Sequence, residues 1–177
     1  MNLWHDLPLS KKFPAEFPVI IEISKGSNVK YELHKDTGLI AVDRILHSAM
    51  HYPLNYGFTP RTYCKDNDPI DVLLMGEYAL MPGSFIQARA IGYIEMIDDG
   101  EEDHKLIAIP VSDPELAHID DISKVSPHLI EKIKNFFATY KIMQKKDVVI
   151  NNHYSREKAL ALLTTAADSY LKKFPNH

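Results

Sequence analysis

Three carboxylates lie within six residues near the middle of the chain, in the run Asp66-Asn67-Asp68-Pro69-Ile70-Asp71. Like charges this close repel one another, so the run costs stability unless cations are present. Pro69 fixes its own φ and biases Asp68 toward extended backbone, which predicts that the acids are held in one shape. The apolar residues that follow, 72–75, are typical of a buried strand. The sequence therefore predicts an acidic loop that leads into a buried strand, with Asp71 at the edge of that strand.

The composition sets limits on what this loop can serve. The chain has 177 residues, of which 45% are hydrophobic and 25% are charged. These values are ordinary for a soluble globular protein, and we expect one domain over residues 1–177. The net charge of −4 offers no basic excess to attract nucleic acid or an anionic membrane. Carboxylate oxygens, in contrast, are the ligands that Mg²⁺, Mn²⁺ and Ca²⁺ prefer.

Other classes of protein are excluded by features that the sequence lacks. The single Cys64 excludes an internal disulfide framework and cannot form a thiolate zinc site alone. No apolar run is long enough to span a bilayer, and residues 1–6 lack the basic-then-apolar order of a secretion signal. We therefore expect a cytoplasmic protein with no membrane partner.

Short strands dominate the first two thirds of the chain. Alternation and apolar runs predict strands at residues 19–23, 29–33, 39–46, 84–97 and 106–109, and a further short strand at 147–150. Residues 1–17 contain prolines and predict an irregular arm, and residues 52–58 predict a packed bend rather than a plain strand.

The early strands carry charges where a half-buried sheet would accept apolar residues. Glu22 faces away from its apolar neighbours, Lys30 and Glu32 share one face, and Arg44 shares a face with Val42. A solvated face with salt bridges and a charged interior explain this pattern equally well.

A second acidic stretch predicts a hairpin. Asp99-Gly100 is a turn signal, and a reversal over residues 99–102 brings Asp98 close to Asp103. Lys105 then lies on the same face as Asp103. Taken alone, this stretch is better explained as a solvated hairpin tip.

Two amphipathic helices follow. The first begins after Ser126 with Pro127 at its first position, and its apolar residues place Tyr140 at the inner edge of the last turn, next to Lys141. The second begins after Ser155, and the residues expected to face inward are Leu160, Leu163, Ala167, Leu171 and Phe174. Strands first and helices late predict a strand-rich closed or nearly closed barrel with the helices packed outside.

The charges that crowd together or break the pattern predict the chemistry. Seven are acidic and four are basic: Glu22, Glu32, Asp66, Asp68, Asp71, Asp98 and Asp103 against Lys30, Arg44, Lys105 and Lys141. Divalent metal would balance the acidic excess, and metal with Arg and Lys together bind phosphate. Two ions about 3.5–4 Å apart could share Asp71 and activate a water. Asp68 is our choice for the base that takes the proton of that water.

These residues resemble a known family. Asp66 to Val72 matches D-[SGDN]-D-[PE]-[LIVMF]-D-[LIVMGAC], the signature of family I soluble inorganic pyrophosphatases. The flanking motifs follow in the family's order and spacing: Glu22, Lys30-x-Glu32, Val42-Asp43-Arg44, Tyr52-Pro53-x-Asn55-Tyr56-Gly57, Asp98, Asp103-x-Lys105 and Phe136-Phe137-x-x-Tyr140-Lys141. The length resembles the short bacterial type.

The resemblance implies a fold and an activity. The fold is α+β and mainly β, an OB-like five-stranded closed barrel with additional strands and two main helices packed outside. The activity is hydrolysis of pyrophosphate to two orthophosphates with several Mg²⁺ ions per active site, in a homo-oligomer that is a hexamer in bacterial members.

The resemblance also implies a role for each matching residue. Asp66, Asp71 and Asp103 are implied metal ligands, joined by Asp98 when substrate brings further ions, and Glu22 and Glu32 act mostly through metal-bound water. Asp68 is implied as the general base. The implied phosphate-binding residues are Lys30, Arg44, Tyr56, Lys105, Tyr140 and Lys141.

Three other functions compete with this interpretation. An EF-hand calcium site is set aside, because Asp71 occupies the position that requires Gly and no flanking helices are predicted. A metal-dependent phosphohydrolase acting on nucleotides or nucleic acids would use the same residue types, and the residues alone do not separate it from a pyrophosphatase. A non-catalytic OB-type module is opposed by the acidic excess, which disfavours a polyanionic strand.

Overall fold

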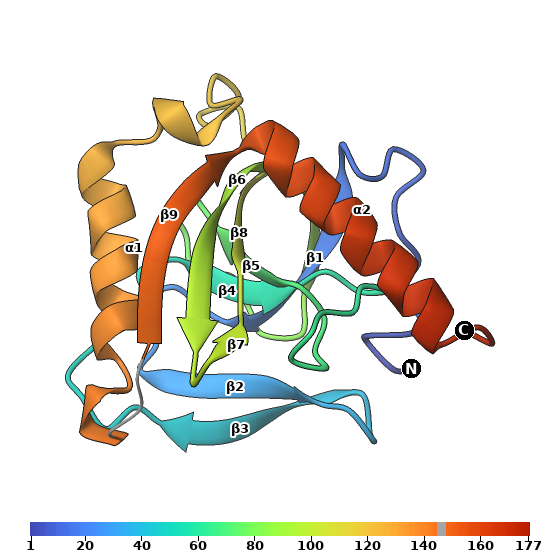
Figure 1. Cartoon of the computed structure of the whole chain (residues 1–177), viewed down its shortest axis with the longest axis horizontal. Helices are drawn as coiled ribbons and strands as arrows, with labels where there is room; N and C mark the ends of the chain where they lie inside the picture. Colours follow the sequence, from blue (N-terminus) through green and yellow to red (C-terminus); the bar gives the residue numbers. More distant parts are fainter. Residues whose placement is uncertain (145–147) are drawn as a thin grey trace.

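A ring of five strands forms the centre of the molecule. The computed structural model describes residues 1–144 and 148–177 (Figure 1). The ring runs β1 (Phe17–Ile23), β4 (Asn55–Phe58), β5 (Asp71–Leu74), β8 (Lys105–Pro110) and β6 (Phe85–Asp98), and β6 closes it by pairing with β1. The β5–β8 pair is parallel and the other pairs in the ring are antiparallel. The OB-like closed barrel expected from the sequence is confirmed.

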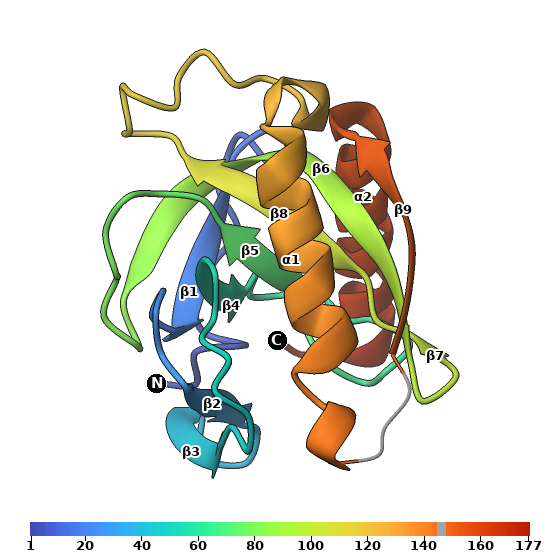
Figure 2. The ribbon, with the colours of Figure 1, turned by 90° about the vertical axis from the view of Figure 1, so that its left-hand side faces the viewer.

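The remaining elements extend or cover this ring. β7 (Glu101–Glu102) and β9 (Val148–Ser155) both pair with β6, while β2 (Val29–His34) and β3 (Leu39–Ile45) form a separate two-stranded sheet. Helices α1 (Pro127–Thr139) and α2 (Arg156–Lys173) lie on different sides of the barrel (Figure 1), and two short 3₁₀ turns span Ile122–Lys124 and Ile142–Gln144. Figure 2 shows the β2–β3 hairpin at one end of the barrel.

The core explains why the barrel strands are almost continuously apolar. Leu73 of β5 packs in a cluster with Ile133 and Phe137 of α1, whereas Val72 and Leu74 pack in another cluster with Leu163 of α2. Successive side chains of a strand point to opposite faces, so a strand covered on both faces must be apolar at every position.

The predicted helix starts are confirmed, and one predicted face is wrong. Ser126 precedes α1 with Pro127 at its first position, and Ser155 precedes α2. Leu171, however, is 61% exposed, while Tyr170 is fully buried. Tyr170 belongs to the inward stripe because its ring packs with Trp4, and this rotates Leu171 to the solvent side of α2.

Two predicted strand boundaries are also corrected. Residues 52–58 are not only a bend, because their second half pairs with β1 and β5 as the strand β4. The strand expected at residues 147–150 continues to Ser155, because its ladder with β6 runs on to Gly92. Its expected first residue, Asp147, lies outside the described residues. Among the described helices, none has the length and apolar character that a membrane span requires.

The pairing of β4 with β1 depends on a residue without a side chain. A Cβ on Gly57 would lie 1.8 Å from the carbonyl oxygen of Ile20. Since that oxygen belongs to the backbone of a barrel strand, it cannot move aside without opening the ladder.

We predict that Gly57→Ala destabilises the protein by about 3 kcal/mol, at the upper end of the usual cost of overpacking a core. Chemical denaturation of the variant measures this loss. Gly76→Ala is the matched control, because a Cβ on Gly76 meets nothing within 4 Å. Equal stability of the two variants would contradict the close β1–β4 approach.

Candidate active site

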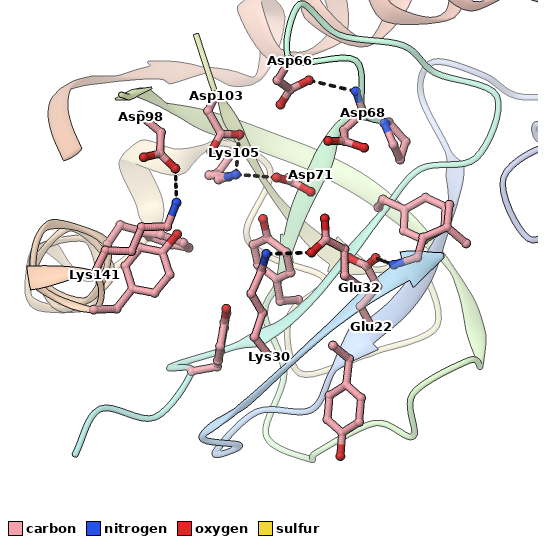
Figure 3. Close-up of a pocket in the computed structure, with 18 of the residues that line it drawn as sticks. Glu22, Lys30, Glu32, Asp66, Asp68, Asp71, Asp98, Asp103, Lys105 and Lys141 are labelled. Atoms are coloured by element: carbon pink, nitrogen blue, oxygen red, sulfur yellow. Dashed lines mark hydrogen bonds and ion pairs between the residues drawn. The ribbon is translucent and has the colours of Figure 1, made fainter. Parts of the chain in front are cut away.

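One pocket of about 450 Å³ collects almost all of the charged residues that break the sequence pattern (Figure 3). Its residues come from β1, the β2 strand, the acidic loop before β5, the β6–β7 turn, β8 and the end of α1. Twelve residues expected at the site line it: Glu22, Lys30, Glu32, Tyr56, Asp66, Asp68, Asp71, Asp98, Asp103, Lys105, Tyr140 and Lys141. The volume lies within the usual range of small-molecule sites.

Lys105 lies at the centre of the pocket and connects two of its acids. The parallel register of β5 and β8 places Asp71 beside Lys105, and Asp103 lies two residues before Lys105. The Lys105 ammonium donates to Asp71 Oδ2 and, at 2.5 Å, to Asp103 Oδ1. Lys105 is only 3% exposed. Burial alone would lower its pKa, but Asp71 and Asp103 outweigh burial and raise it well above the usual value.

A second ion pair joins the first helix to the end of β6. The Lys141 ammonium, just beyond α1, contacts Asp98 Oδ2 (Figure 3). The other oxygen, Asp98 Oδ1, is buried and has no hydrogen-bond partner in the part of the chain that the structure describes. A buried carboxylate oxygen without a partner costs free energy, so this atom is suited to a ligand that brings a positive charge or a donor.

The β2 strand brings a third group of charges to the pocket. Lys30 contacts Glu32 at 3.0 Å and Asp43 of β3 at 3.3 Å. Glu22 accepts a 2.7 Å hydrogen bond from the backbone N–H of Leu33, which connects β1 to β2. Burial, and then the negative charge of Asp71, raise the pKa of Glu22 well above its usual value.

The acidic loop has a defined local geometry. Asn67 adopts a left-handed φ of 67°, and the backbone N–H of Asp68 donates to Asp66 Oδ1 at 3.1 Å. Asn tolerates this conformation better than most residues, because its side chain can form local hydrogen bonds. Burial, together with the charges of Asp71, Asp103 and Asp68, raises the pKa of Asp66 to about 7, although the hydrogen bond from Asp68 opposes the shift.

Buried phenol groups line the side of the pocket near α1. Burial raises the pKa values of Tyr52, Tyr56 and Tyr140 above the usual value for a phenol, so these groups keep their protons at neutral pH. They are therefore hydroxyl donors to an anion. For Tyr52 the sequence leaves two interpretations open, a core aromatic residue and a hydroxyl donor to an anion, and the structure places Tyr52 at the pocket.

One expected site residue does not line the pocket. Arg44 lies on β3 in register with Lys30, and its Nε donates to Asp43 Oδ2 at 2.7 Å. Tyr140 and Glu32, which line the pocket, nevertheless act electrostatically on the Arg44 guanidinium, so Arg44 lies close to the pocket without lining it. Another residue, Lys35, was not expected, yet its ammonium lies 2.5 Å from Asp68 Oδ1.

The comparisons with known proteins agree with this geometry. Residues 19–171 match the family model described as inorganic pyrophosphatase. The chain belongs to the inorganic pyrophosphatase family. A soluble inorganic pyrophosphatase of Zea mays is 50% identical over 167 residues, which cover 94% of this chain and 78% of the maize protein. Soluble inorganic pyrophosphatase 1 of Arabidopsis thaliana is also 50% identical over 167 residues, with 79% of its length covered.

Solved structures of pyrophosphatases share the fold. The inorganic pyrophosphatase of Thermus thermophilus has a TM-score of 0.92 and 36% identity, with 96% of this chain and 99% of the bacterial chain covered. The enzyme from Helicobacter pylori has a TM-score of 0.89 and 41% identity, with 93% and 98% covered.

The charge balance of the pyrophosphatase pocket favours cations. Nine carboxyl side chains and three lysines line it. Within the described ranges, no three acidic, histidine or cysteine side chains converge as a preformed metal site. The carboxylates of Asp71 and Asp103 instead contact the Lys105 ammonium. The donor set still fits Mg²⁺, because it consists of hard carboxylate oxygens, one of them buried without a partner.

Proposed function

We propose that this chain hydrolyses inorganic pyrophosphate to two orthophosphates, with Mg²⁺ as cofactor and Asp68 as general base. The observation that carries the proposal is the convergence of nine carboxylates, three lysines and buried phenols in one pocket of a pyrophosphatase-family fold. Such a pocket attracts a ligand that is an anion and also binds divalent cations, and pyrophosphate is the smallest phosphoanhydride of that kind.

The metal ligands that we propose are the acids nearest the acidic loop. Asp66, Asp71 and Asp103 would hold Mg²⁺ directly, Asp98 would join them with the substrate, and Glu22 and Glu32 would act through water. When bound, Mg²⁺ polarises phosphate oxygens and acidifies the attacking water. Asp66 supports this assignment, because its carboxyl pairs with no lysine in the described contacts and its pKa is raised to about 7 by burial and neighbouring acids.

The cations and phenols would bind the phosphate oxygens. Lys30, Lys105, Lys141, Tyr56 and Tyr140 line the pocket as donors. Arg44 is also proposed to bind phosphate, although it does not line the pocket and its Nε contacts Asp43. A guanidinium binds two phosphate oxygens at once, which a lysine does not.

Asp68 is more exposed than two of the proposed metal ligands, Asp71 and Asp103, and this suits a base. It lies at the outer rim, with 37% of its side chain exposed, whereas Asp71 and Asp103 are 20% and 16% exposed. A rim position leaves room for a water between Asp68 and the metal-binding acids. The proton of that water passes to an Asp68 carboxylate oxygen as the water attacks phosphorus, and orthophosphate leaves.

The resemblance to the family supports further proposals about domain extent, location and oligomeric state. We propose a single catalytic domain over residues 1–177, a cytoplasmic location and a homo-oligomer, which the resemblance puts at a hexamer. The short bacterial type is proposed from the resemblance alone, since the plant relatives, at 50% identity, are more similar in sequence than the bacterial enzymes at 36% and 41%.

The direct test of this function is phosphate release from pyrophosphate. We expect turnover in millimolar Mg²⁺ and its loss in a chelator, because the pocket acids repel the substrate without metal. Parallel assays with a nucleoside triphosphate test the competing phosphohydrolase. Faster release from the nucleotide than from pyrophosphate would contradict the proposal.

The test of the base is Asp68→Asn, which keeps the shape of the side chain and removes its basicity. We expect kcat to fall by roughly 10²–10⁴-fold, the usual contribution of general base catalysis. Steady-state kinetics in saturating Mg²⁺ measure the change, and Asp36→Asn in the β2–β3 turn is the control. A variant with nearly unchanged kcat would show that the attacking water needs no protein base.

A further inference from the structure

The N-terminal arm contacts residues 61–63, which lead into the acidic loop, although the arm precedes the region that the family model matches, residues 19–171. Trp4 is 3% exposed, and its Nε1 donates to the carbonyl of Thr62 at 2.9 Å. The N–H of Arg61 donates to the carbonyl of Trp4 at 3.0 Å. The Trp4 ring also stacks on Tyr63, whose hydroxyl donates to Asn67 inside the acidic loop.

The same arm also contacts the turn between β2 and β3. Asn2 Nδ2 donates to the carbonyl of Lys35 at 3.2 Å. A Cβ on Gly38 would lie 2.5 Å from Asn2 Cα, so the arm passes directly over this turn. The arm thus connects the separate β2–β3 sheet to the loop that carries Asp66 and Asp68.

Lys35 lies where these two contacts meet. Its ammonium is 2.5 Å from Asp68 Oδ1 and 3.1 Å from the carbonyl oxygen of Asn67, and it lies 6.0 Å from the centre of the Trp4 ring. An ammonium with a carboxylate, a carbonyl and an aromatic ring around it is restricted in orientation. One of its three partners is the proposed general base.

We infer that the N-terminal arm belongs to the active site, with Trp4 and Lys35 as positioning residues for Asp68. The arm fixes the turn that carries Lys35, and the Trp4 ring lies beside the Lys35 ammonium. Lys35 in turn holds one carboxylate oxygen of Asp68, so that the other oxygen can face the attacking water. This inference rests on the proposed role of Asp68.

The solvent exposure of the Lys35–Asp68 ion pair distinguishes a positioning role of Lys35 from a structural one. Lys35 and Asp68 retain 44% and 37% side-chain exposure, and an ion pair that exposed adds little to stability. Loss of the Lys35 charge should therefore leave the melting temperature almost unchanged. An effect on kcat without an effect on stability is the signature of positioning.

The test uses Lys35→Met, which keeps the length of the side chain and removes its charge. We expect kcat to fall roughly 10–100-fold, as is typical when the hydrogen-bonding partner of a site carboxylate is removed, while KM and the melting temperature stay close to the wild type. Lys35→Arg should recover most of the rate. Lys12→Met is the control, because Lys12 forms an exposed pair with Glu16 in the same arm. Trp4→Phe should also lower kcat by removing the indole beside Lys35.

A double-mutant cycle separates failure of this inference from failure of the proposed function. If Lys35 acts through Asp68, Lys35→Met should add no loss in an Asp68→Asn background. Two outcomes would overturn the role of Lys35 and leave the proposed function in place. One is that the losses of kcat in the two variants are additive, and the other is that Lys35→Met keeps the wild-type kcat while Asp68→Asn has a reduced kcat. Wild-type kcat for Asp68→Asn would instead overturn the proposed base, whatever Lys35→Met does.

Discussion

The ion pairs of Lys105 with Asp71 and Asp103 are the interaction on which the rest of the site depends. A buried ammonium is tolerated only when carboxylates compensate the loss of water, and the crowded carboxylates are tolerated only beside a cation. The parallel β5–β8 pairing brings Asp71 and Lys105 together from positions 34 residues apart. The pairing of β5 with β8 inside the barrel therefore also assembles these charges, and the apolar strands on both sides keep them partly shielded from solvent.

Much of the fold follows from local pattern. The apolar runs predicted the barrel strands, and the Ser126-Pro127 start predicted the first helix. What pattern does not supply is pairing between distant segments. The β1–β6 ladder, which closes the ring, joins residues 65 to 71 positions apart. Local pattern also does not show that β2 and β3 form a sheet of their own. Leu171 was misplaced for a related reason, since distant residues such as Trp4 and Ile20 make Tyr170 the buried neighbour.

The site was predictable where charge conflicted with burial. Glu22, Lys30 and Glu32 broke the alternation of their strands, and the residues alone left a solvated face and a charged interior equally open. The structure places all three at the pocket. Arg44 broke the pattern in the same way but does not line the pocket, and its Nε is bound to Asp43 on the same strand. Lys35 gave no signal, because a lysine in a turn is ordinary and its partners come from two remote segments.

We propose that cations neutralise the acids of this pocket, with Lys105 as one of them and divalent metal ions as the others. The most direct measurement is the melting temperature of the wild type and of Lys105→Met, in Mg²⁺ and in chelator at fixed ionic strength. In chelator the variant should lose about 3 kcal/mol, as expected when one member of a buried ion pair is removed. Mg²⁺ at about 100 times its Kd should add roughly 2.7 kcal/mol to the wild type, and it should stabilise the variant more, because Asp71 and Asp103 are then released to bind it. Lys124→Met, which removes an exposed pair with Asp120, is the control. Melting temperatures that do not respond to Mg²⁺ in either protein would contradict the account.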